Sequence, residues 1–522
     1  MPASTTKYPI GIQSFSVIRQ GGYAYVDKTA LIYRLVTEGK YYFLSRPRRF
    51  GKSLLLSTIQ AYFEGRKELF DDLAIARLEK DWESYPVLML SLASYNPTEM
   101  DLRDVLDSII SNMELDYGKR VETESLSARF GNVIMSAYEK TGRQVVVLVD
   151  EYDAPVVAHL EDDPRREEVR NLLKSVYVNL KDKDACIKFA MLAGVSRFSK
   201  MTIFSGLNNL DDISLLPEWS ELCGITDKEL VDNFPHGIKK LGEKLHTGYD
   251  GAMSMLKSHY DGYHFTADSK DLYNPFSLLK ALKNSQIGSY WFQSGTPTFL
   301  LKYLSRIDRP LEKVLSDNIS EMALSDIETY RTSPEALLFQ TGYLTIKGYD
   351  VRRRRYSLGI PNKEVEEGLF TELLAYNVKT DKGRLDNYIW DIRDALEEGK
   401  PAEALEKIRS LFAGIPANVT QNRTELFFEN NLFMLFKLIG IDVRAEWWTA
   451  DGRIDMLLEM SDHVYVMELK LDRSAEEALQ QIDTKEYALP WKYDNRKVIK
   501  IGINFSSSKR NIDSWLIATS ED

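Results

Sequence analysis

The sequence is poor in the residues that build disulfide and zinc frameworks. Its 522 residues include two cysteines, Cys186 and Cys223, which are too few for a disulfide framework or a structural zinc site. The six histidines are scattered without the spacing of metal ligands. These shortages exclude a disulfide-stabilised secreted domain and a zinc-finger protein.

Two further absences concern membranes and charge. No apolar run reaches the roughly 20 residues of a transmembrane helix, and no signal-peptide pattern opens the sequence. We therefore expect no membrane partner and a cytoplasmic location. The formal net charge is −11, so any contact with nucleic acid must be local. With 44% hydrophobic residues, the chain is long enough for about two to four domains.

The stretch from Tyr41 to Phe63 has the pattern of a phosphate-binding loop. The apolar run from Tyr41 to Leu44 predicts a buried strand, and Lys52 and Ser53 begin a predicted helix after a short loop. Amide groups and the helix dipole at such a start favour an anion. We expect Lys52 to reach the β- and γ-phosphates and Ser53 to help hold Mg²⁺. Because Arg46 replaces the usual first glycine, the motif alone fits a basic strand-to-helix turn equally well.

A second apolar run, Val145 to Val149, ends in the acids Asp150 and Glu151. Such a run is typical of a parallel strand buried on both faces, and open α/β sheets bind ligands at the carboxyl ends of their strands. We expect Asp150 to coordinate Mg²⁺ through water and Glu151 to polarise the attacking water. The alternative is a solvated acidic turn. Ser196 follows a third run, Ile187 to Val195, and either contacts the γ-phosphate or lies in an ordinary loop.

Strands and helices alternate through the first part of the chain. The strand predicted at Val87 to Leu92 is followed by helices around Asp101 to Leu115 and Leu126 to Lys140. This alternation predicts a doubly wound sheet. Residues 200–325 are predicted mostly helical, and their aromatic motif YDGYHF favours packing of a lid over base stacking.

The middle of the chain has the pattern of a small winged-helix-like module. A helix at Pro334 to Gln340 precedes strands at Tyr343 to Ile346 and Tyr356 to Ile360, and a helix starts from Asn362. The four arginines Arg352 to Arg355 stand at the predicted hairpin turn. They could meet phosphates or form a solvated basic loop, and the sequence does not separate the two.

The last part of the chain contains a hairpin whose register can be counted. Side chains alternate along strands, so a tight turn between two strands pairs Asp455 with Glu468 and leaves Lys470 on the same face. Two carboxylates can hold Mg²⁺ with several waters, and Lys470 could stabilise developing charge or orient water. The alternative is a surface ion-pair hairpin. The opposite face is expected to hold apolar residues: Ile454, Met456, Tyr465, Met467 and Leu469.

Several motifs together resemble the bacterial AAA-ATPase-like family. They are YAYVDKTALIYRL, FLSRPRRFGKSLLLST, YFEG, VDEYDAP and AGVSRFSK, followed by YDGYHF, YNPFSLLKAL, YWFQSGTP and LLFQTGYLTI. Loops of this family read RPRRFGKS, so the resemblance implies that the missing glycine is a family trait. It also implies a P-loop fold with ATP and Mg²⁺ as cofactors. The expected ATP-binding residues are Arg49, Gly51, Lys52, Ser53, Asp150 and Ser196.

The hairpin resembles the PD-(D/E)xK nuclease superfamily, because Asp455 is followed after twelve residues by Glu-x-Lys and then by a helix. The following AEEALQQIDTKEYALPW is similar to the helix of the nuclease domain that accompanies these ATPases, which implies a catalytic role for Gln481. Glu425 or Glu429 would complete the site. The implied partner is nucleic acid, with DNA preferred over RNA, in mobile-element or defence biology. The sequence does not decide whether the protein forms a homo-oligomer.

Together these patterns predict an α/β protein with two chemical centres. The leading hypothesis is an ATP-binding, ATP-hydrolysing protein joined to a Mg²⁺-dependent nuclease with an α/β restriction-endonuclease-like fold. The alternative is a nucleotide switch whose last domain binds nucleic acid or a protein without cutting. The expected catalytic residues are Glu151, Asp455, Glu468, Lys470 and Gln481, and the expected metal ligands are Ser53, Asp150, Asp455 and Glu468. The expected parts are a P-loop domain at 1–215, a helical lid at 216–326, the winged-helix-like module at 327–380 and the nuclease-like domain at 381–522.

Overall fold

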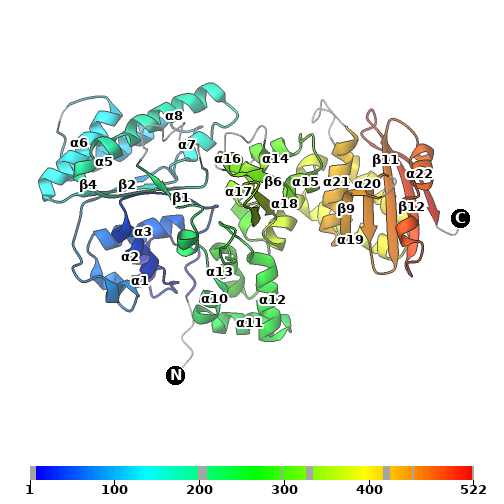
Figure 1. Ribbon diagram of the computed structural model, residues 1–522, viewed down its shortest axis with the longest axis horizontal. Helices are drawn as coiled ribbons and strands as arrows, with labels where there is room; N and C mark the ends of the chain where they lie inside the picture. Colours follow the sequence, from blue (N-terminus) through cyan, green and yellow to red (C-terminus); the bar gives the residue numbers. More distant parts are fainter. Residues whose placement is uncertain are drawn as a thin grey trace. The chain divides into compact units, whose positions relative to one another are not determined.

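A computed structural model describes residues 7–120, 122–197, 209–294, 298–324, 333–415, 424–449 and 452–519. The chain forms two compact units (Figure 1). The first contains Met1–Trp291 and Asp317–Glu364, and the second contains Phe292–Ser316 and Val365–Asp522. The second unit therefore includes a short segment from the middle of the chain. The four-part division expected from the sequence stays a prediction.

The first unit is built on a five-stranded sheet with the order β2-β3-β4-β1-β5, whose neighbouring strands all run parallel. Every residue of β1 and β3 is buried, as expected for strands covered by helices on both faces. The predicted doubly wound sheet is confirmed. Its strands are β1 (Tyr41–Ser45), β2 (Val87–Ser91), β3 (Val145–Asp150), β4 (Ile187–Gly194) and β5 (Asp211–Asp212).

Strand β4 lies between β1 and β3. Ser45 at the end of β1 is in register with Gly194, and Asp150 at the end of β3 is in register with Ala193. The phosphate-binding motif and the acidic pair therefore emerge at the same edge of the sheet. Strand β4 thus separates the two motifs within the sheet.

Helices cover both faces of this sheet. Figure 1 shows α1, α2 and α3 on one face and α5, α6 and α8 on the other. Helix α3 begins at Lys52, as expected. Ser125 caps the start of α6, and Gly142, in the left-handed conformation that glycine adopts readily, caps its end. The helices are α1 (Phe15–Gln20), α2 (Thr29–Glu38), α3 (Lys52–Phe63), α4 (Ile75–Leu78), α5 (Leu102–Tyr117), α6 (Leu126–Thr141), α7 (Ala154–Val157), α8 (Asp163–Tyr177) and α9 (Asn179–Asp182).

The rest of the first unit is mostly helical, as predicted, with a small antiparallel sheet ordered β6-β8-β7. At the turn between β7 and β8, Arg354 pairs with Glu321 at 2.5 Å, and Arg355 donates to the Asn318 carbonyl. These local partners favour an ion-paired turn over a phosphate contact. The elements are α10 (Asp227–Asn233), α11 (Pro235–Leu245), α12 (Gly248–Tyr260), α13 (Pro275–Asn284), β6 (Asn318–Ser320), α16 (Glu321–Leu324), α17 (Pro334–Thr341), β7 (Thr345–Asp350) and β8 (Arg355–Gly359).

The aromatic motif YDGYHF, which follows α12, packs against the phosphate-binding loop. Tyr263 and Phe265 are buried, and their rings meet the ring of Phe50 edge-on with centroid distances of 4.8 and 5.3 Å. Because these rings are covered, they are not available for base stacking. The predicted packing role is confirmed.

Asp261 of this motif should make stability depend on pH. It is only 2% exposed, and burial, helped by the charges of Asp271 and Asp227, raises the pKa of its carboxyl to about 7 against the opposing effects of the Gly262 amide and Lys257. The folded protein thus keeps a proton that the unfolded chain loses near pH 4, so the stability due to this group is complete below about pH 4 and falls until about pH 7. Asp261→Asn removes the ionisable group.

Urea unfolding gives the stability of Asp261→Asn minus that of the wild type. This difference should be about 1–3 kcal/mol larger at pH 7.5 than at pH 5. Asp268→Asn, which changes an exposed acid seven residues away, is the matched control and should show no such gain. An equal difference at both pH values for Asp261→Asn would mean that this carboxyl ionises normally.

The second unit is built on a mixed sheet with the order β13-β12-β11-β10-β9. Phe428 of α21 stacks on Phe505 from one face, and Gly502 lies against Ala475 of α22 on the other. A Cβ at Gly502 would meet the Ala475 carbonyl oxygen at 2.4 Å, so glycine permits this close packing of helix on strand. This agrees with the predicted restriction-endonuclease-like class.

Its helices are α14 (Thr298–Leu304), α15 (Leu311–Ser316), α18 (Lys363–Val378), α19 (Lys382–Glu397), α20 (Pro401–Phe412), α21 (Glu425–Leu438) and α22 (Ala475–Thr484), with the first residues of α18 in the first unit. Its strands are β9 (Asp442–Trp448), β10 (Arg453–Glu459), β11 (His463–Leu471), β12 (Lys497–Ser506) and β13 (Asn511–Thr519). In the part of the chain that the structure describes, no helix is both long and apolar enough to cross a membrane.

Candidate functional site

The loop between β1 and α3 has the backbone of an anion cradle. Gly51 has a φ of 95°, and Arg49 also adopts a left-handed conformation with a φ of 66°. Lys52, the first residue of α3, is buried, and its ammonium donates to the carbonyl oxygens of Arg46 at 2.9 Å and Pro47 at 3.0 Å. The lysine is therefore held against the loop, at the helix start where an anion is favoured.

Arg46 explains how the loop forms without its usual first glycine. The side chain is 1% exposed and donates to the carbonyl oxygens of Ser45 and Ser214 at 2.8 Å and of Trp219 at 3.3 Å. Its guanidinium also lies 4.1 Å from the ring centroid of Phe265. Burial lowers its pKa to about 10, so it stays charged at neutral pH. Arg46 thus ties the loop to the segment after β5.

We expect Arg46→Ala to destabilise the protein by at least about 3 kcal/mol, because several buried carbonyl groups would lose their donor and a cavity would open. Arg48→Ala, which removes an exposed arginine from the same loop, should change stability by less than about 0.5 kcal/mol. Urea unfolding of both variants measures this. Equal stability of the two would show that Arg46 does not anchor the loop.

The acids after β3 lie within electrostatic reach of Lys52. Asp150 is buried at the end of the strand, and Glu151 takes a left-handed conformation with a φ of 49°. Burial raises the pKa of Glu151, which the Lys52 ammonium opposes, and lowers the pKa of Lys52, which the neighbouring acids oppose. The structure thus brings the predicted lysine and both predicted acids together. Ser53 is half-buried in the first turn of α3.

Asp153 is a member of this cluster that sequence reasoning missed. It is 2% exposed and accepts hydrogen bonds from the backbone amides of Ser196 at 2.6 Å and Val195 at 3.2 Å. Asp153 therefore links the end of β3 to the end of β4 and fixes the position of Ser196, whose side chain is itself buried. No signal distinguished Asp153 in the sequence, because its role depends on β4 being the neighbouring strand.

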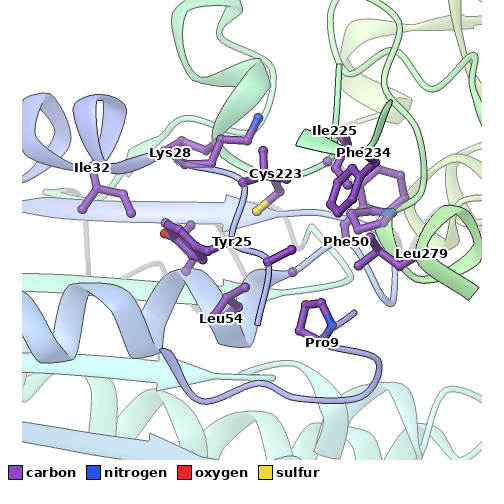
Figure 2. Close-up of a pocket in the computed structure, with 17 residues that line it drawn as sticks. Pro9, Tyr25, Lys28, Ile32, Phe50, Leu54, Cys223, Ile225, Phe234 and Leu279 are labelled. Carbon is purple, nitrogen blue, oxygen red and sulfur yellow. The ribbon is translucent and has the colours of Figure 1, made fainter. Parts of the chain in front are cut away.

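An apolar pocket adjoins the phosphate-binding loop (Figure 2). Phe50, Gly51 and Leu54 line it next to the cradle, and the space among its lining residues, open solvent included, is about 610 Å³. Tyr25 comes from the segment before α2, and Leu279 comes from α13. The pocket thus offers an apolar surface beside an anion site, a combination that suits the base and phosphates of a nucleotide.

The motif YVDKT forms another wall of this pocket and joins three elements. Asp27 accepts hydrogen bonds from Thr29 at 2.8 Å and from the amide of Ala74 at 2.7 Å, so it caps α2 and the start of α4 together. Lys28 pairs with Glu229 of α10 at 2.6 Å. The motif thus connects the pocket to the helical region.

In the second unit, strands β10 and β11 have the predicted register. Met456 pairs with Met467 and Leu457 with Val466, which places Asp455 opposite Glu468. Beyond Met456 the ladder stops, and the Asp455 carboxylate accepts a hydrogen bond from the Leu469 amide at 2.8 Å.

One detail of the predicted faces is wrong. Ile454 shares a buried cluster with Leu457, although strict alternation would place the two on opposite faces. The strand departs from regular alternation beside Asp455, where its ladder with β11 ends.

The side chains of Glu468 and Lys470 form a buried ion pair beside Asp455. The Lys470 ammonium donates to Oε1 of Glu468 at 2.7 Å. The other oxygen, Oε2, is buried and accepts no hydrogen bond from a donor among the described residues, while the Asp455 and Glu468 carboxyls lie within hydrogen-bonding reach of each other. Burial and the charge of Asp455 raise the pKa of Glu468 to about 8, and burial also raises the pKa of Asp455. With their pKa values raised in this way, the two acids keep a proton that a bound cation would displace.

Both acids proposed for α21 lie within electrostatic reach of Asp455. Burial and the charge of Asp455 raise the pKa of Glu429 to about 8 and raise the pKa of Glu425 as well. Glu429 is buried and its Oε1 has no hydrogen-bond partner within the described ranges, whereas Glu425 also interacts with Lys470. Gln481 is half-buried on α22, and its role stays a prediction.

Among the residues that the structure describes, no three His, Cys, Asp or Glu side chains are arranged so that they could hold a metal ion. Asp455 and Glu468 form a pair, which suits an ion that keeps several waters, as Mg²⁺ does. The Oε2 of Glu468, which accepts from no donor among the described residues, has the chemistry of such a ligand. The two acids therefore suit Mg²⁺, which keeps several of its waters, better than a metal ion whose ligands all come from the protein.

Comparison with known proteins agrees with both centres. Residues 9–204 match the family described as predicted AAA-ATPase, and residues 423–515 match the PD-(D/E)XK nuclease superfamily. The chain is 36% identical over 530 residues to an uncharacterized protein in the vnfD 5′ region of Azotobacter chroococcum mcd 1, with 98% of this chain and 99% of that relative aligned. This chain therefore belongs to the AAA-ATPase-like family and carries a C-terminal domain of the PD-(D/E)XK nuclease superfamily.

Proposed function

We propose that this protein binds and hydrolyses ATP in its first unit and cleaves phosphodiester bonds of nucleic acid in its second. The observation that carries the proposal is the buried group of Asp455, Glu468 and Lys470, in which two carboxyls lie within hydrogen-bonding reach of each other beside one ammonium. A surface ion-pair hairpin would not bury two acids, because isolated buried charge is costly.

In the first unit, the loop amides and Lys52 would hold the phosphates while the base enters the apolar pocket. Lys52 would exchange its bonds to the Arg46 and Pro47 carbonyls for bonds to phosphate oxygens.

Ser53 and Asp150 would hold Mg²⁺, which neutralises phosphate charge when it is bound. Glu151, whose pKa is raised by burial, would accept a proton from water. Arg49 and Ser196 would complete the ATP contacts.

In the second unit, Asp455 and Glu468 would hold Mg²⁺, which activates water and neutralises charge on the cleaved phosphate when it is bound. Lys470 would orient the attacking water or offset negative charge, because its ammonium already lies at Glu468. Glu425 or Glu429 from α21 would add a further carboxylate, and Gln481 would assist from α22. DNA is the expected substrate.

A plasmid-nicking assay tests this function. The full-length protein should nick supercoiled DNA with Mg²⁺ or Mn²⁺ and should lose this activity in EDTA. Parallel reactions with and without ATP show whether the two units are coupled. A wild-type protein that binds DNA with either metal but never cuts DNA or RNA would instead support a nucleotide switch with a non-cleaving binding domain.

A further inference from the structure

The phosphate-binding loop contains three arginines, of which the fold engages two. Arg46 is buried against carbonyl oxygens, and the Arg49 guanidinium lies 3.8 Å from the ring centroid of Phe276 in α13. Arg48 stands between them and is exposed, and its side chain makes no hydrogen bond or ion pair within the described ranges. Packing therefore accounts for Arg46 and Arg49, whereas the position of Arg48 has to be explained by what it faces.

Arg48 begins beside the Lys52 ammonium. This ammonium donates to the Pro47 carbonyl oxygen at 3.0 Å, and the carbon of that carbonyl is bonded to the Arg48 nitrogen. Standard peptide bond lengths then place the Arg48 nitrogen within about 6 Å of the ammonium. The chain turns directly afterwards, because Arg49 has a φ of 66°. Arg48 therefore lies at the turn of the loop, next to the lysine that is expected to hold the β- and γ-phosphates.

The charge of Arg48 also acts on Glu151. It lowers the pKa of the Glu151 carboxyl, as the Lys52 ammonium does, while burial raises that pKa. The Arg48 guanidinium is thus near the carboxyl, although no direct ion pair joins the two in the part of the chain that the structure describes. The sheet order explains this, since β1 and β3 both neighbour β4 and end at the same edge. Arg48 and Lys52 are therefore two cations beside the acid expected to act as the base.

ATP hydrolysis at this place would develop negative charge that a guanidinium can stabilise. The oxygen of water bonds to the γ-phosphorus, one proton of that water passes to Glu151, and the other stays on the phosphate. The bond from phosphorus to the bridging oxygen breaks, and its electron pair stays on ADP. A guanidinium can donate two parallel hydrogen bonds to phosphate oxygens, which one ammonium cannot do. An arginine in this role accelerates nucleotide hydrolysis by about 10³–10⁵-fold.

We propose that Arg48 contacts the γ-phosphate of ATP and stabilises the charge that develops there during hydrolysis. The role rests on the proposed function, because it requires ATP at Lys52 and Glu151 as the base. It differs from the role of Lys52, which would hold the phosphates before any reaction begins. An arginine that is merely solvated would not distinguish the transferring phosphoryl group from ADP.

Binding of a transition-state analogue tests the proposal apart from turnover. Isothermal titration of the full-length protein compares ADP and Mg²⁺ alone with the same ligands plus aluminium fluoride, which mimics the phosphoryl group in transfer. Arg48→Ala should keep the affinity for ADP but lose at least about tenfold of the affinity for the fluoride complex. Its ATP hydrolysis should fall by at least about 100-fold. Arg48→Lys should be intermediate, because it keeps the charge but not the paired donors.

Arg77→Ala, which removes an exposed arginine from α4, is the matched control and should behave as the wild type does. A wild-type rate of hydrolysis in Arg48→Ala would overturn the role of Arg48 alone. An equal loss of affinity for ADP and for the fluoride complex would also overturn it, since Arg48 would then act on the bound nucleotide in general. A wild type that binds ATP but neither hydrolyses it nor gains affinity with aluminium fluoride would refute the proposed hydrolysis and this role together.

Discussion

Replacing Lys52 with alanine is expected to reduce the affinity for ATP with Mg²⁺ by at least about 100-fold. The loss of a buried ammonium at the cradle removes charge-assisted hydrogen bonds to the phosphates, which are worth about 3 kcal/mol or more together. Isothermal titration of the folded variant with ATP and Mg²⁺ measures the change. Lys67→Ala, which removes an exposed lysine just after α3, is the matched control and should bind as the wild type does.

Glu151→Gln separates binding from hydrolysis at the same site. The amide keeps the size of the side chain but cannot accept a proton from water, so ATP should still bind while its hydrolysis slows by about 100-fold or more. Unchanged ATP affinity in folded Lys52→Ala would refute the nucleotide site. A wild-type rate in Glu151→Gln would instead remove only the role of Glu151 as the base.

Asp455→Asn is expected to lower metal-dependent cleavage by more than about 100-fold while leaving ATP affinity unchanged, because it removes a charged metal ligand from the other unit. Asparagine is preferable to alanine here. The Asp455 carboxylate accepts the buried Leu469 amide, and alanine would leave that donor unpaired at a cost of about 1–3 kcal/mol. The amide oxygen of asparagine can replace this acceptor.

The same variant should be more stable than the wild type without metal, because it removes one of two neighbouring buried acids that repel each other. Asp462→Asn, an exposed change at the turn of the same hairpin, is the control for stability and cleavage. Nicking, Mg²⁺ titration and urea unfolding in EDTA give the three measurements. If Asp455→Asn still cleaves DNA, Asp455 is not part of the active site. If it also loses stability, the role of Asp455 is structural.

Lys470→Ala should retain metal binding but lose most of the cleavage rate, since it removes charge stabilisation rather than a ligand. It also leaves Glu468 without its ammonium partner, so this variant should be less stable than Asp455→Asn. The opposite order of stability would show that Glu468 does not depend on Lys470.

Local patterns in the sequence were sufficient to locate most elements. The start of α3 at Lys52 follows from the loop and the apolar spacing after it, and the register of β10 with β11 follows from alternation and one tight turn. Both depend on neighbours that are close along the chain. The acids at the end of β3 were found because a fully apolar strand with a polar end is a strong local signal.

Contacts between residues far apart in the chain could not be predicted from local patterns. In the sequence, Arg46 only replaces the usual first glycine of a motif, and the fold shows that it donates to carbonyl groups more than 160 residues away in the chain. The regular alternation assumed for Ile454 fails because the ladder with β11 ends at Met456, which depends on where two strands separate. Neither outcome has a signature in the nearby sequence.

The sequence by itself determined which residues could carry chemistry: a lysine at a helix start, acids at a strand end, and two acids with a lysine in a hairpin. Only the tertiary structure decided what surrounds them, from the strand β4 between the two ATPase motifs to the Asp153 carboxylate that links the ends of β3 and β4. The physical reason is that periodicity and turn chemistry act over a few residues. Burial, pKa shifts and strand order arise from groups that meet only when the chain has folded.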